Sequence, residues 1–380
     1  MFASQRHLFS IPDQVAYLNS ATTGPLLKSA ERAAQKAIQL KAEPWRITSR
    51  TFFEPLEETR ALFARFLGCD ADNVAFIPAV SYAMAIAARN IDVRPGDTIV
   101  VLDEQFPSHV YPWRNKALET GGKMVSVPRP LPSSQGNWTQ AVLEAITKKT
   151  AIAALPHCHW TDGAALDLNA IGARCREVGA ALVLDVTQSL GVMPLDLAEV
   201  QPDFLAVSAH KWMLGPYSYS YLYVADHHLH GEPLEENWFN RKGSENFARL
   251  VDYRDDYQPG ARRFDVGEAS NFFLTPVAKA SLEQLLAWGT DNMSRHLGEI
   301  TREIAARAQD MGLVAPPEHL RGPHMIGLQL PSGAPEDLPA YLAEKEVYVG
   351  VRGDKIRVAP HMHTTPQDLH RFFSALEEEL

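Results

Sequence analysis

The chain has 380 residues, which is enough for two or three domains at the usual ~100–200 residues each. Hydrophobic residues make up 46% and charged residues 22%, the composition of an ordinary globular protein. The 46 acidic residues exceed the 36 Lys and Arg residues by ten, so we expect neither nucleic acid nor an anionic membrane as the main partner. An anionic ligand must then be held by a local cluster of polar or basic groups.

The three cysteines, Cys69, Cys158 and Cys175, share no CxxC spacing, so we expect neither a disulfide framework nor a structural zinc site. Sparse cysteines favour the reducing cytoplasm as the location. No stretch approaches the ~20 apolar residues that span a bilayer. Residues 1–14 also lack the continuous apolar segment of a secretory signal. We therefore expect a cytoplasmic protein with no membrane partner.

Short apolar runs alternate with helical patterns over the first 225 residues. Two helical patterns come first, at Leu27–Ala42 and Pro55–Leu67. Seven apolar runs predict buried strands: Val74–Ile77, Thr98–Leu102, Lys123–Val127, Ala151–Leu155, Ala181–Val186, Asp203–Val207 and Ser220–Val224. Helical patterns separate most of them: Ser81–Asn90, His109–Thr120, Thr139–Thr147 and Leu168–Val178. This alternation predicts an α/β fold with a seven-stranded, mainly parallel sheet covered on both faces.

The composition changes after the last of these strands. Residues 226–265 are rich in charges and indicate irregular structure. Helical patterns return at Pro276–Trp288 and Asn292–Asp310. The rest predicts short strands and helices: Met325–Leu330, Leu338–Lys345, Val347–Val351, Lys355–Ala359 and Thr365–Leu380. We expect an N-terminal arm at 1–14, a large domain at 15–290 and a small α+β domain at 291–380.

Polar or aromatic groups follow five of the predicted strands. Ligands of open α/β sheets bind outside the carboxyl ends of the strands, so these groups could converge on one ligand. The five segments are 79–82, 103–106, 156–160, 185–188 and 208–211.

The clearest chemical signal is the pair VLDVTQS (Val183–Ser189) and AVSAHKW (Ala206–Trp212). Asp185 ends one apolar strand, and Lys211 follows the next. A lysine that forms a Schiff base and a carboxylate that keeps a pyridine nitrogen protonated are the two groups that pyridoxal phosphate requires. The alternative is a structural ion pair with a solvated lysine.

The segment from Asp185 through Asp203 to Trp212 resembles the signature of class V aminotransferase-like enzymes. These fold-type I pyridoxal phosphate enzymes include cysteine desulfurases, kynureninases and isopenicillin N epimerases. Other segments resemble parts of the same family in the correct order: Tyr17–Pro25, Phe76–Ala87, His157–Gly163, Arg263–Glu268, and the pair Val351–Gly353 and Ile356–Val358. The resemblance covers about residues 15–375.

The resemblance implies a role for individual residues around the cofactor. Lys211 matches the Schiff-base lysine, and Asp185 matches the partner of the pyridine nitrogen. Gln188 matches a side chain near the phenolic oxygen. Residues matching the phosphate site are Ser208, His210, Val80 and Ser81. Ser81 also opens a predicted helix, and a helix N-terminus binds phosphate through its free N–H groups; a plain N-cap is the alternative.

Two aromatic residues and one arginine complete the implied site. Phe106, or as an alternative His109, lies where the family stacks a ring on the cofactor. Trp160 stands where desulfurases have an asparagine near the phenolic oxygen, and it offers only an N–H donor; a structural role is the alternative. Arg357 matches the arginine that binds the substrate carboxylate through its planar fork, with Arg352 and Arg263 as weaker candidates.

Other site types find no support in the sequence. No GxGxxG follows a predicted strand, no GxxxxGK[ST] occurs, and no G-x-S-x-G elbow is present. Groups of histidines, such as His227 and His228, lack carboxylates at a familiar metal spacing, so we expect no catalytic metal. A pyridoxal phosphate-binding regulator is a non-enzymatic alternative, but it usually has a separate DNA-binding module.

The position of the cysteines bears on the reaction. A desulfurase needs a nucleophilic cysteine on a small-domain loop, and no cysteine follows Cys175. We therefore expect a class V aminotransferase acting on an amino acid or amine, and no desulfurase activity. A kynureninase-like hydrolase, a carbon–sulfur lyase or an epimerase is the alternative. Because Arg263–Glu268 resembles a segment that reaches between subunits, we expect a homodimer with shared active sites.

Overall fold

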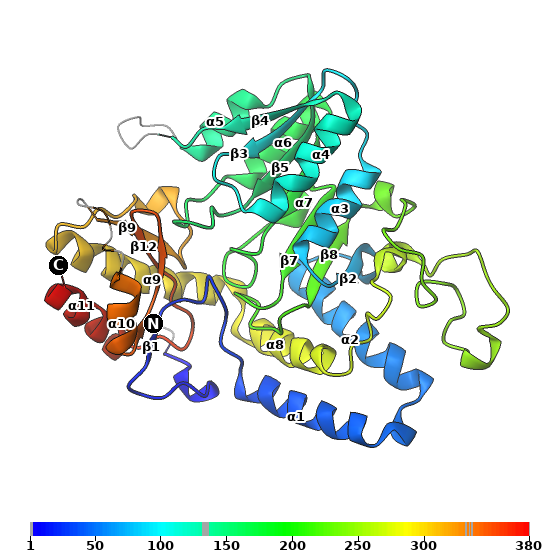
Figure 1. Ribbon diagram of the computed structural model, residues 1–380, viewed down its shortest axis with the longest axis horizontal. Coiled ribbons are helices and arrows are strands. Elements are labelled where there is room, and N and C mark those ends of the chain that lie inside the picture. The colour runs from blue at the N-terminus through cyan, green and yellow to red at the C-terminus, as the bar shows by residue number, and fades with distance from the viewer. Residues whose placement is uncertain (1–2, 131–136, 331–332, 334, 336, 380) are drawn as a thin grey trace.

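A seven-stranded sheet forms the centre of the computed structural model, which describes residues 3–130, 137–330, 333, 335 and 337–379 (Figure 1). The strand order is β2-β8-β7-β6-β5-β3-β4, and only β8 runs antiparallel to its neighbours. The bounds are β2 Val74–Ile77, β3 Thr98–Leu102, β4 Lys123–Val127, β5 Thr150–Pro156, β6 Ala181–Asp185, β7 Phe204–Ser208 and β8 Ser220–Val224. The predicted mainly parallel α/β sheet is confirmed. Residues 1–2 of the expected arm and residue 380 of the last predicted helix lie outside the residues that the structure describes.

Helices cover both faces of the sheet, and alternate residues of each strand separate two hydrophobic cores. In β7, Leu205 and Val207 belong to one core, whereas Phe204 and Ala206 belong to the other. The second core contains residues of α3 (Val80–Asn90) and α4 (Tyr111–Thr120). Residues of α2, α5, α6 and α8 fill the first. Burial on both faces explains why the strands are continuously apolar.

Most of the remaining large-domain helices lie close to their predicted ranges, with one exception. They are α1 Lys28–Ala42, α5 Trp138–Ala145, α6 Leu168–Val178 and α8 Leu274–Trp288, and a short helix that was not predicted, α7, spans Leu197–Val200. The exception is α2 (Ser49–Leu67), which begins before the predicted start at Pro55. The earlier start is stabilised by the Thr48–Thr51 capping box and by Phe53, whose ring stacks on Phe239 at 4.7 Å.

The C-terminal elements form a separate three-stranded sheet, in the order β11-β12-β9. Their bounds are α9 Thr290–Asp310, β9 Ile326–Gln329, α10 Leu338–Glu344, β10 Val347–Tyr348, β11 Gly350–Arg352, β12 Lys355–Val358 and α11 Pro366–Glu379. The single strand predicted at Val347–Val351 is wrong. The chain instead forms β10 and then β11, because β10 pairs with the N-terminal strand β1 (Ala16–Tyr17) while β11 pairs with β12.

The pairing of β1 with β10 places the start of the chain beside its end, as Figure 1 shows. Leu18 is fully buried in the same core as Val358 and Phe372. Residues 16–18 therefore pack with the C-terminal elements, and the division of the chain at residue 290 stays a prediction. Within the described ranges, no helix has both the length and the hydropathy that crossing a bilayer requires.

Candidate active site

A cavity of about 450 Å³ opens at the carboxyl edge of the sheet. Its wall includes residues that follow β2, β3, β5, β6 and β7, so the predicted convergence of five strand ends is confirmed. Nine of the ten candidate residues line it: Val80, Ser81, Phe106, Trp160, Asp185, Gln188, Ser208, His210 and Lys211. Arg357 is the exception.

Lys211 lies at the centre of this group, three residues after the end of β7. Its Nζ is 5.5 Å from the centroid of the Phe106 ring. Among the described residues, Nζ has no hydrogen-bond partner. Burial lowers the pKa of Lys211 to about 8, against the opposing effect of Asp185 and with a further lowering by Arg357 and Arg352. The side chain therefore has a neutral amine at a lower pH than an ordinary lysine does.

The backbone of Lys211 is approached closely by the N-terminal segment. Gly24 N–H donates to the carbonyl of His210 at 2.7 Å. A Cβ on Gly24 would lie 2.1 Å from the carbonyl oxygen of Lys211. A glycine is therefore required at this contact, and the N-terminal segment helps to position the lysine.

Asp185 ends β6, the strand next to β7 in the sheet. Its Oδ1 accepts a hydrogen bond from the backbone N–H of Thr187 at 2.9 Å. The hydroxyl of Thr187 in turn accepts from the backbone N–H of Ser208 at 3.0 Å. Thr187 thus fixes the ends of β6 and β7 relative to each other, a role that the sequence did not indicate.

A polar pocket for an anion lies beside α3. The helix α3 begins with Val80 and Ser81, and its N-cap residue, Ala79, makes no side-chain capping bond to the described residues. The Ser208 hydroxyl lies 3.0 Å from Nδ1 of His210. Burial and the neighbouring Lys211 lower the pKa of His210 to about 4, so its ring is neutral near pH 7. A free helix N-terminus and nearby hydroxyl groups suit a phosphate.

Phe106 and Trp160 form one wall of the cavity, with their ring centroids 5.6 Å apart and nearly perpendicular. The indole N–H of Trp160 donates to the carbonyl of Glu104 at 2.8 Å, so this donor is already used within the chain. His109 is buried: its Nδ1 accepts from the Trp113 indole at 3.2 Å. Its Nε2 then donates to the Leu155 carbonyl at 3.3 Å. Phe106 is therefore the ring with a free face.

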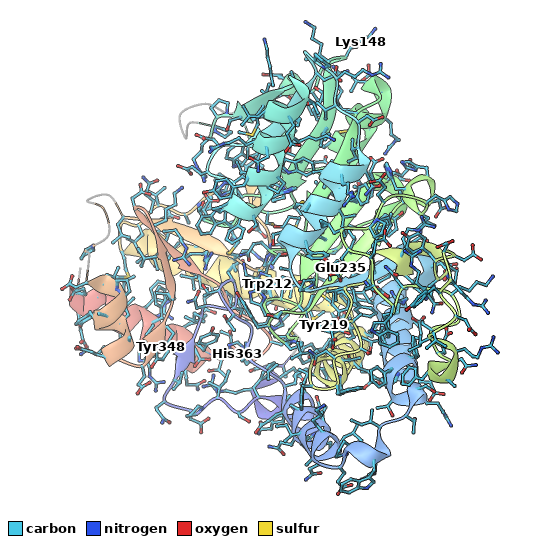
Figure 2. The ribbon with its side chains drawn as sticks, turned by 45° about the vertical axis from the view of Figure 1, so that its right-hand side comes forward. Lys148, Trp212, Tyr219, Glu235, Tyr348 and His363 are labelled. Carbon is cyan, nitrogen blue, oxygen red and sulfur yellow. The ribbon has the colours of Figure 1, made fainter. Side chains whose placement is uncertain are left out.

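Gln188 uses both ends of its amide within the protein. Its Nε2 donates to the Ala21 carbonyl at 3.0 Å, and its Oε1 accepts from the Trp212 indole at 2.9 Å. Trp212 is fully buried where the sheet meets the C-terminal elements (Figure 2). In this structure Gln188 therefore connects the cavity wall to the N-terminal segment and to the packing behind Lys211.

Arg357 lies on β12, just outside the cavity lining, and is only 1% exposed. Its Nη1 donates to the Trp160 carbonyl and its Nη2 to the Thr22 hydroxyl, both at 2.6 Å. Its Nε has no hydrogen-bond partner among the described residues. Burial and the neighbouring Arg352 lower the pKa of Arg357 to about 9. The buried guanidinium is thus next to another cation rather than a carboxylate, which favours the binding of an anion.

Residues 16–369 match the sequence model of the family described as Aminotransferase class-V. The chain belongs to the class V aminotransferase family. It is 27% identical over 369 residues to an uncharacterized aminotransferase of Bacillus subtilis (strain 168), covering 96% of this chain and 94% of the other. It is 25% identical over 375 residues to isopenicillin N epimerase of Streptomyces clavuligerus, with the same coverages.

Solved structures share the class V fold. A variant of C-DES with glycine covalently linked to its PLP cofactor superposes with a TM-score of 0.86 at 20% identity, over 98% of each chain. Cysteine desulfurases have the same fold. The predicted family and the fold-type I architecture are therefore confirmed.

The class V family uses pyridoxal phosphate, and the cavity fits this cofactor. In the described part of the chain, an amine without a hydrogen-bond partner, a neighbouring carboxylate and a helix N-terminus without a side-chain cap surround a space of about 450 Å³. This chain is therefore a pyridoxal phosphate-dependent enzyme. Sequence reasoning gave no role to Thr187, Gly24 and Thr22, which position the candidate residues. All three nevertheless lie in segments that it singled out, Gly24 and Thr22 in Tyr17–Pro25 and Thr187 in Val183–Ser189.

Proposed function

We propose that this class V enzyme is an aminotransferase that acts on an amino acid or an amine. The observation that supports this most is the state of Lys211. Among the other nitrogen bases of the described cavity wall, His109 and His159 have both ring nitrogens in hydrogen bonds. His210 bonds Ser208 through Nδ1 and belongs to the proposed phosphate site. Lys211 would therefore be the base that moves a proton, and amino transfer can use one base on one face of the substrate.

Bound pyridoxal phosphate stabilises the negative charge that remains when a bond to the substrate α-carbon breaks. Lys211 would bind the cofactor covalently and afterwards move the proton through Nζ. Asp185, held by Thr187, would keep a proton on the ring nitrogen. Val80, Ser81, Ser208 and His210 would bind the phosphate.

Phe106 would stack on the cofactor ring. Because its side chain has no proton to give, it would also leave the opposite face without an acid or base. Trp160 and Gln188 would orient the surrounding wall, since their polar atoms already bond within the chain. We propose that these two residues shape the site and that neither donates to the phenolic oxygen.

Arg357 would bind the carboxylate of an amino-acid substrate. Among the described residues its buried Nε has no hydrogen-bond partner, and its Nη2 contacts a hydroxyl and an amide oxygen. These two donors would turn to the carboxylate when the substrate binds. Arg352, whose guanidinium lies 5.6 Å from the Trp160 ring centroid, adds positive charge. An anion would therefore be attracted although the whole chain has a net charge of −10.

Desulfurase activity is not part of this proposal. Cys158 lines the cavity, but burial raises the pKa of its thiol to about 12 and its Sγ packs 3.6 Å from the sulfur of Met193. A thiol in this state is a poor nucleophile. Cys69 and Cys175 are absent from the cavity wall.

Screening of amino donors against a set of 2-oxo acids tests the proposal. An aminotransferase converts a donor to its oxo product only while an acceptor is aminated in equal amount. Inversion of the donor without oxo product would instead favour an epimerase, which the similarity to isopenicillin N epimerase makes the second candidate. Release of sulfide, pyruvate or alanine from cysteine or cystine without an acceptor would contradict the proposal.

We also propose a homodimer in which Arg263–Glu268 approaches the partner's active site. Part of this segment serves the chain itself, because Asp265 is buried and forms an ion pair with Arg60 at 2.7 Å. The cytoplasmic location and the lack of a nucleic-acid partner stay predictions.

A further inference from the structure

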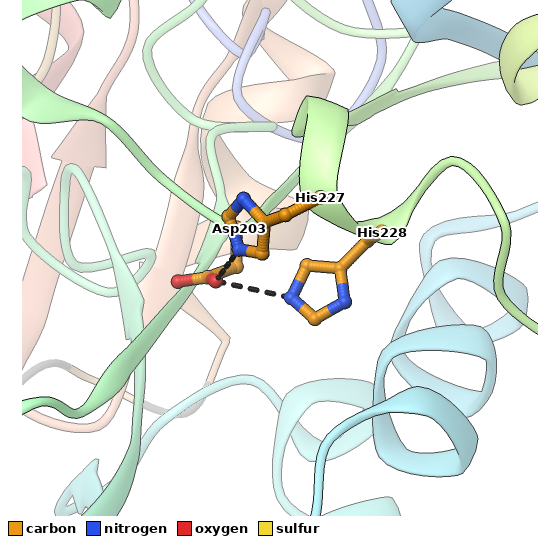
Figure 3. Close-up of side chains that lie close together, drawn as sticks. All are labelled: Asp203, His227 and His228. Carbon is orange, nitrogen blue, oxygen red and sulfur yellow. Dashed lines mark hydrogen bonds and ion pairs between the residues drawn. The ribbon is translucent and has the colours of Figure 1, made fainter.

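Asp203, His227 and His228 meet at the amino edge of the sheet, opposite the active-site cavity (Figure 3). Asp203 directly precedes β7, and the two histidines end the 3-10 turn Asp226–His228 that follows β8. The Nε2 atoms of His227 and His228 lie 2.8 and 3.1 Å from the same oxygen, Oδ1 of Asp203. The sequence did not indicate this cluster, because Asp203 and His227 are 24 residues apart.

The carboxylate and one ring are held in place by neighbouring groups. The other oxygen of Asp203, Oδ2, accepts from the backbone N–H of Leu182 at 2.7 Å, which directs Oδ1 toward the histidines. The His228 ring packs 4.7 Å from the Phe204 ring and is 17% exposed.

Two imidazole nitrogens and one carboxylate oxygen are a typical set of zinc ligands. The three atoms lie within 4.8 Å of one another. Tetrahedral bonds of ~2.0–2.1 Å place neighbouring ligand atoms about 3.3 Å apart. Each histidine nitrogen would therefore move outward from Oδ1 of Asp203 by a few tenths of an ångström to admit the ion. A cavity of about 1170 Å³ adjoins the cluster and gives water access to a fourth position.

We propose that Asp203, His227 and His228 bind one divalent transition-metal ion of the zinc class. Both rings would then be neutral, with their proton on Nδ1. The ion would connect β6, β7 and the turn after β8. Five residues of β7 separate this site from Ser208 in the active-site wall, about 16 Å at ~3.3 Å per residue. The ion therefore has no direct role in the reaction of Lys211.

Calorimetric titration of the full-length, cofactor-loaded protein with ZnCl₂ tests the proposal. We expect one equivalent of zinc to bind, and His227→Gln to weaken binding at least tenfold. His227 is 67% exposed, so this variant should keep the fold and the cofactor absorbance. His230→Gln, two residues after His228 but outside the cluster, is the matched control and should bind zinc like the wild type.

A second measurement separates this site from the cofactor site. Co²⁺ bound by nitrogen and oxygen ligands should give visible absorption bands that vanish in the His227→Gln/His228→Gln double variant. The cofactor's own absorbance should stay unchanged throughout. Absence of zinc binding by the wild type, or wild-type affinity in the His227→Gln variant, would overturn the proposal.

Discussion

At the scale of single residues, the active site combines a buried amine with a carboxylate on the next strand. Lys211 has no hydrogen-bond partner among the described residues, and burial lowers its pKa to about 8. Asp185 is fixed by the N–H of Thr187. Under the proposed function these two residues would have different tasks: the amine would transfer the proton, whereas the carboxylate would act from one fixed orientation.

Asp185→Asn should preserve the fold and some cofactor binding, because an amide oxygen can still accept from Thr187. A neutral amide cannot keep the ring nitrogen of the cofactor protonated, so most turnover should be lost. The loss should lower kcat and kcat/KM together, since the interaction acts mainly in the transition state. Steady-state kinetics with the best amino donor measure this. A near-normal kcat in this variant would show that Asp185 has only a structural role.

Arg357→Lys should weaken amino-acid binding although the charge is kept, because an ammonium cannot form two parallel bonds to a carboxylate. Loss of one charge-assisted bond of ~1.5–3 kcal/mol corresponds to a roughly 10- to 150-fold decrease in kcat/KM. An amine that lacks the carboxylate is the control substrate and should be unaffected. Equal losses for both substrates would mean that Arg357 acts through its bonds to Trp160 and Thr22 instead.

At the scale of elements, the sequence predicts best what depends on local burial. The bounds of β2, β3 and β8 agree with the prediction, because strands buried on both faces are continuous apolar runs between polar turns. The bounds of β4 agree as well, although this edge strand is only partly buried. The error at Val347–Val351 has a non-local cause, since β1 provides the partner for β10 from the other end of the chain. A pairing between residues 16 and 347 has no local signal.

Contacts between distant parts of the chain limit the prediction of the site as well. Lys211, Asp185 and the phosphate-side residues follow strands, so their convergence could be predicted from strand order alone. The bonds of Gln188 and Trp160 could not be predicted, because they depend on Ala21, Trp212 and Glu104, which approach only in the folded chain.

Three buried histidines near Trp212 make the C-terminal elements sensitive to acid. Burial lowers the pKa of His324 and His361 to about 3 and that of His363 to about 4. In the unfolded chain these histidines have the ordinary pKa of about 6.5. Below that pH the unfolded chain therefore holds more protons than the folded chain. Stability should therefore fall as the pH drops from about 6.5 to about 4.

His324→Gln tests this sensitivity, because the amide can still donate to the Gln188 carbonyl and does not titrate. Each such histidine contributes up to about 1.4 kcal/mol of unfolding free energy per pH unit. Urea unfolding between pH 7 and pH 5 should therefore show a shallower loss in the variant than in the wild type. His230→Gln, an exposed position, is the control. Equal pH dependence in all three proteins would contradict the assignment.

At the scale of the whole molecule, the proposed homodimer predicts that activity depends on protein concentration. If Arg263–Glu268 contributes to the partner's site, dilution below the dimer dissociation constant should reduce activity and the dimer fraction in parallel. Sedimentation velocity and activity assays at matched concentrations measure the two quantities. Full activity in a sample that sediments as a monomer would exclude shared active sites.

The central claim is that Lys211 binds pyridoxal phosphate in a class V enzyme. Borohydride reduction of the cofactor-loaded protein, followed by proteolysis and mass spectrometry, tests it most directly. We expect a yellow protein whose reduced cofactor is found on the peptide that contains Lys211, and a Lys211→Ala variant that is not labelled. Label on another lysine, or no label after incubation with pyridoxal phosphate, would contradict the account.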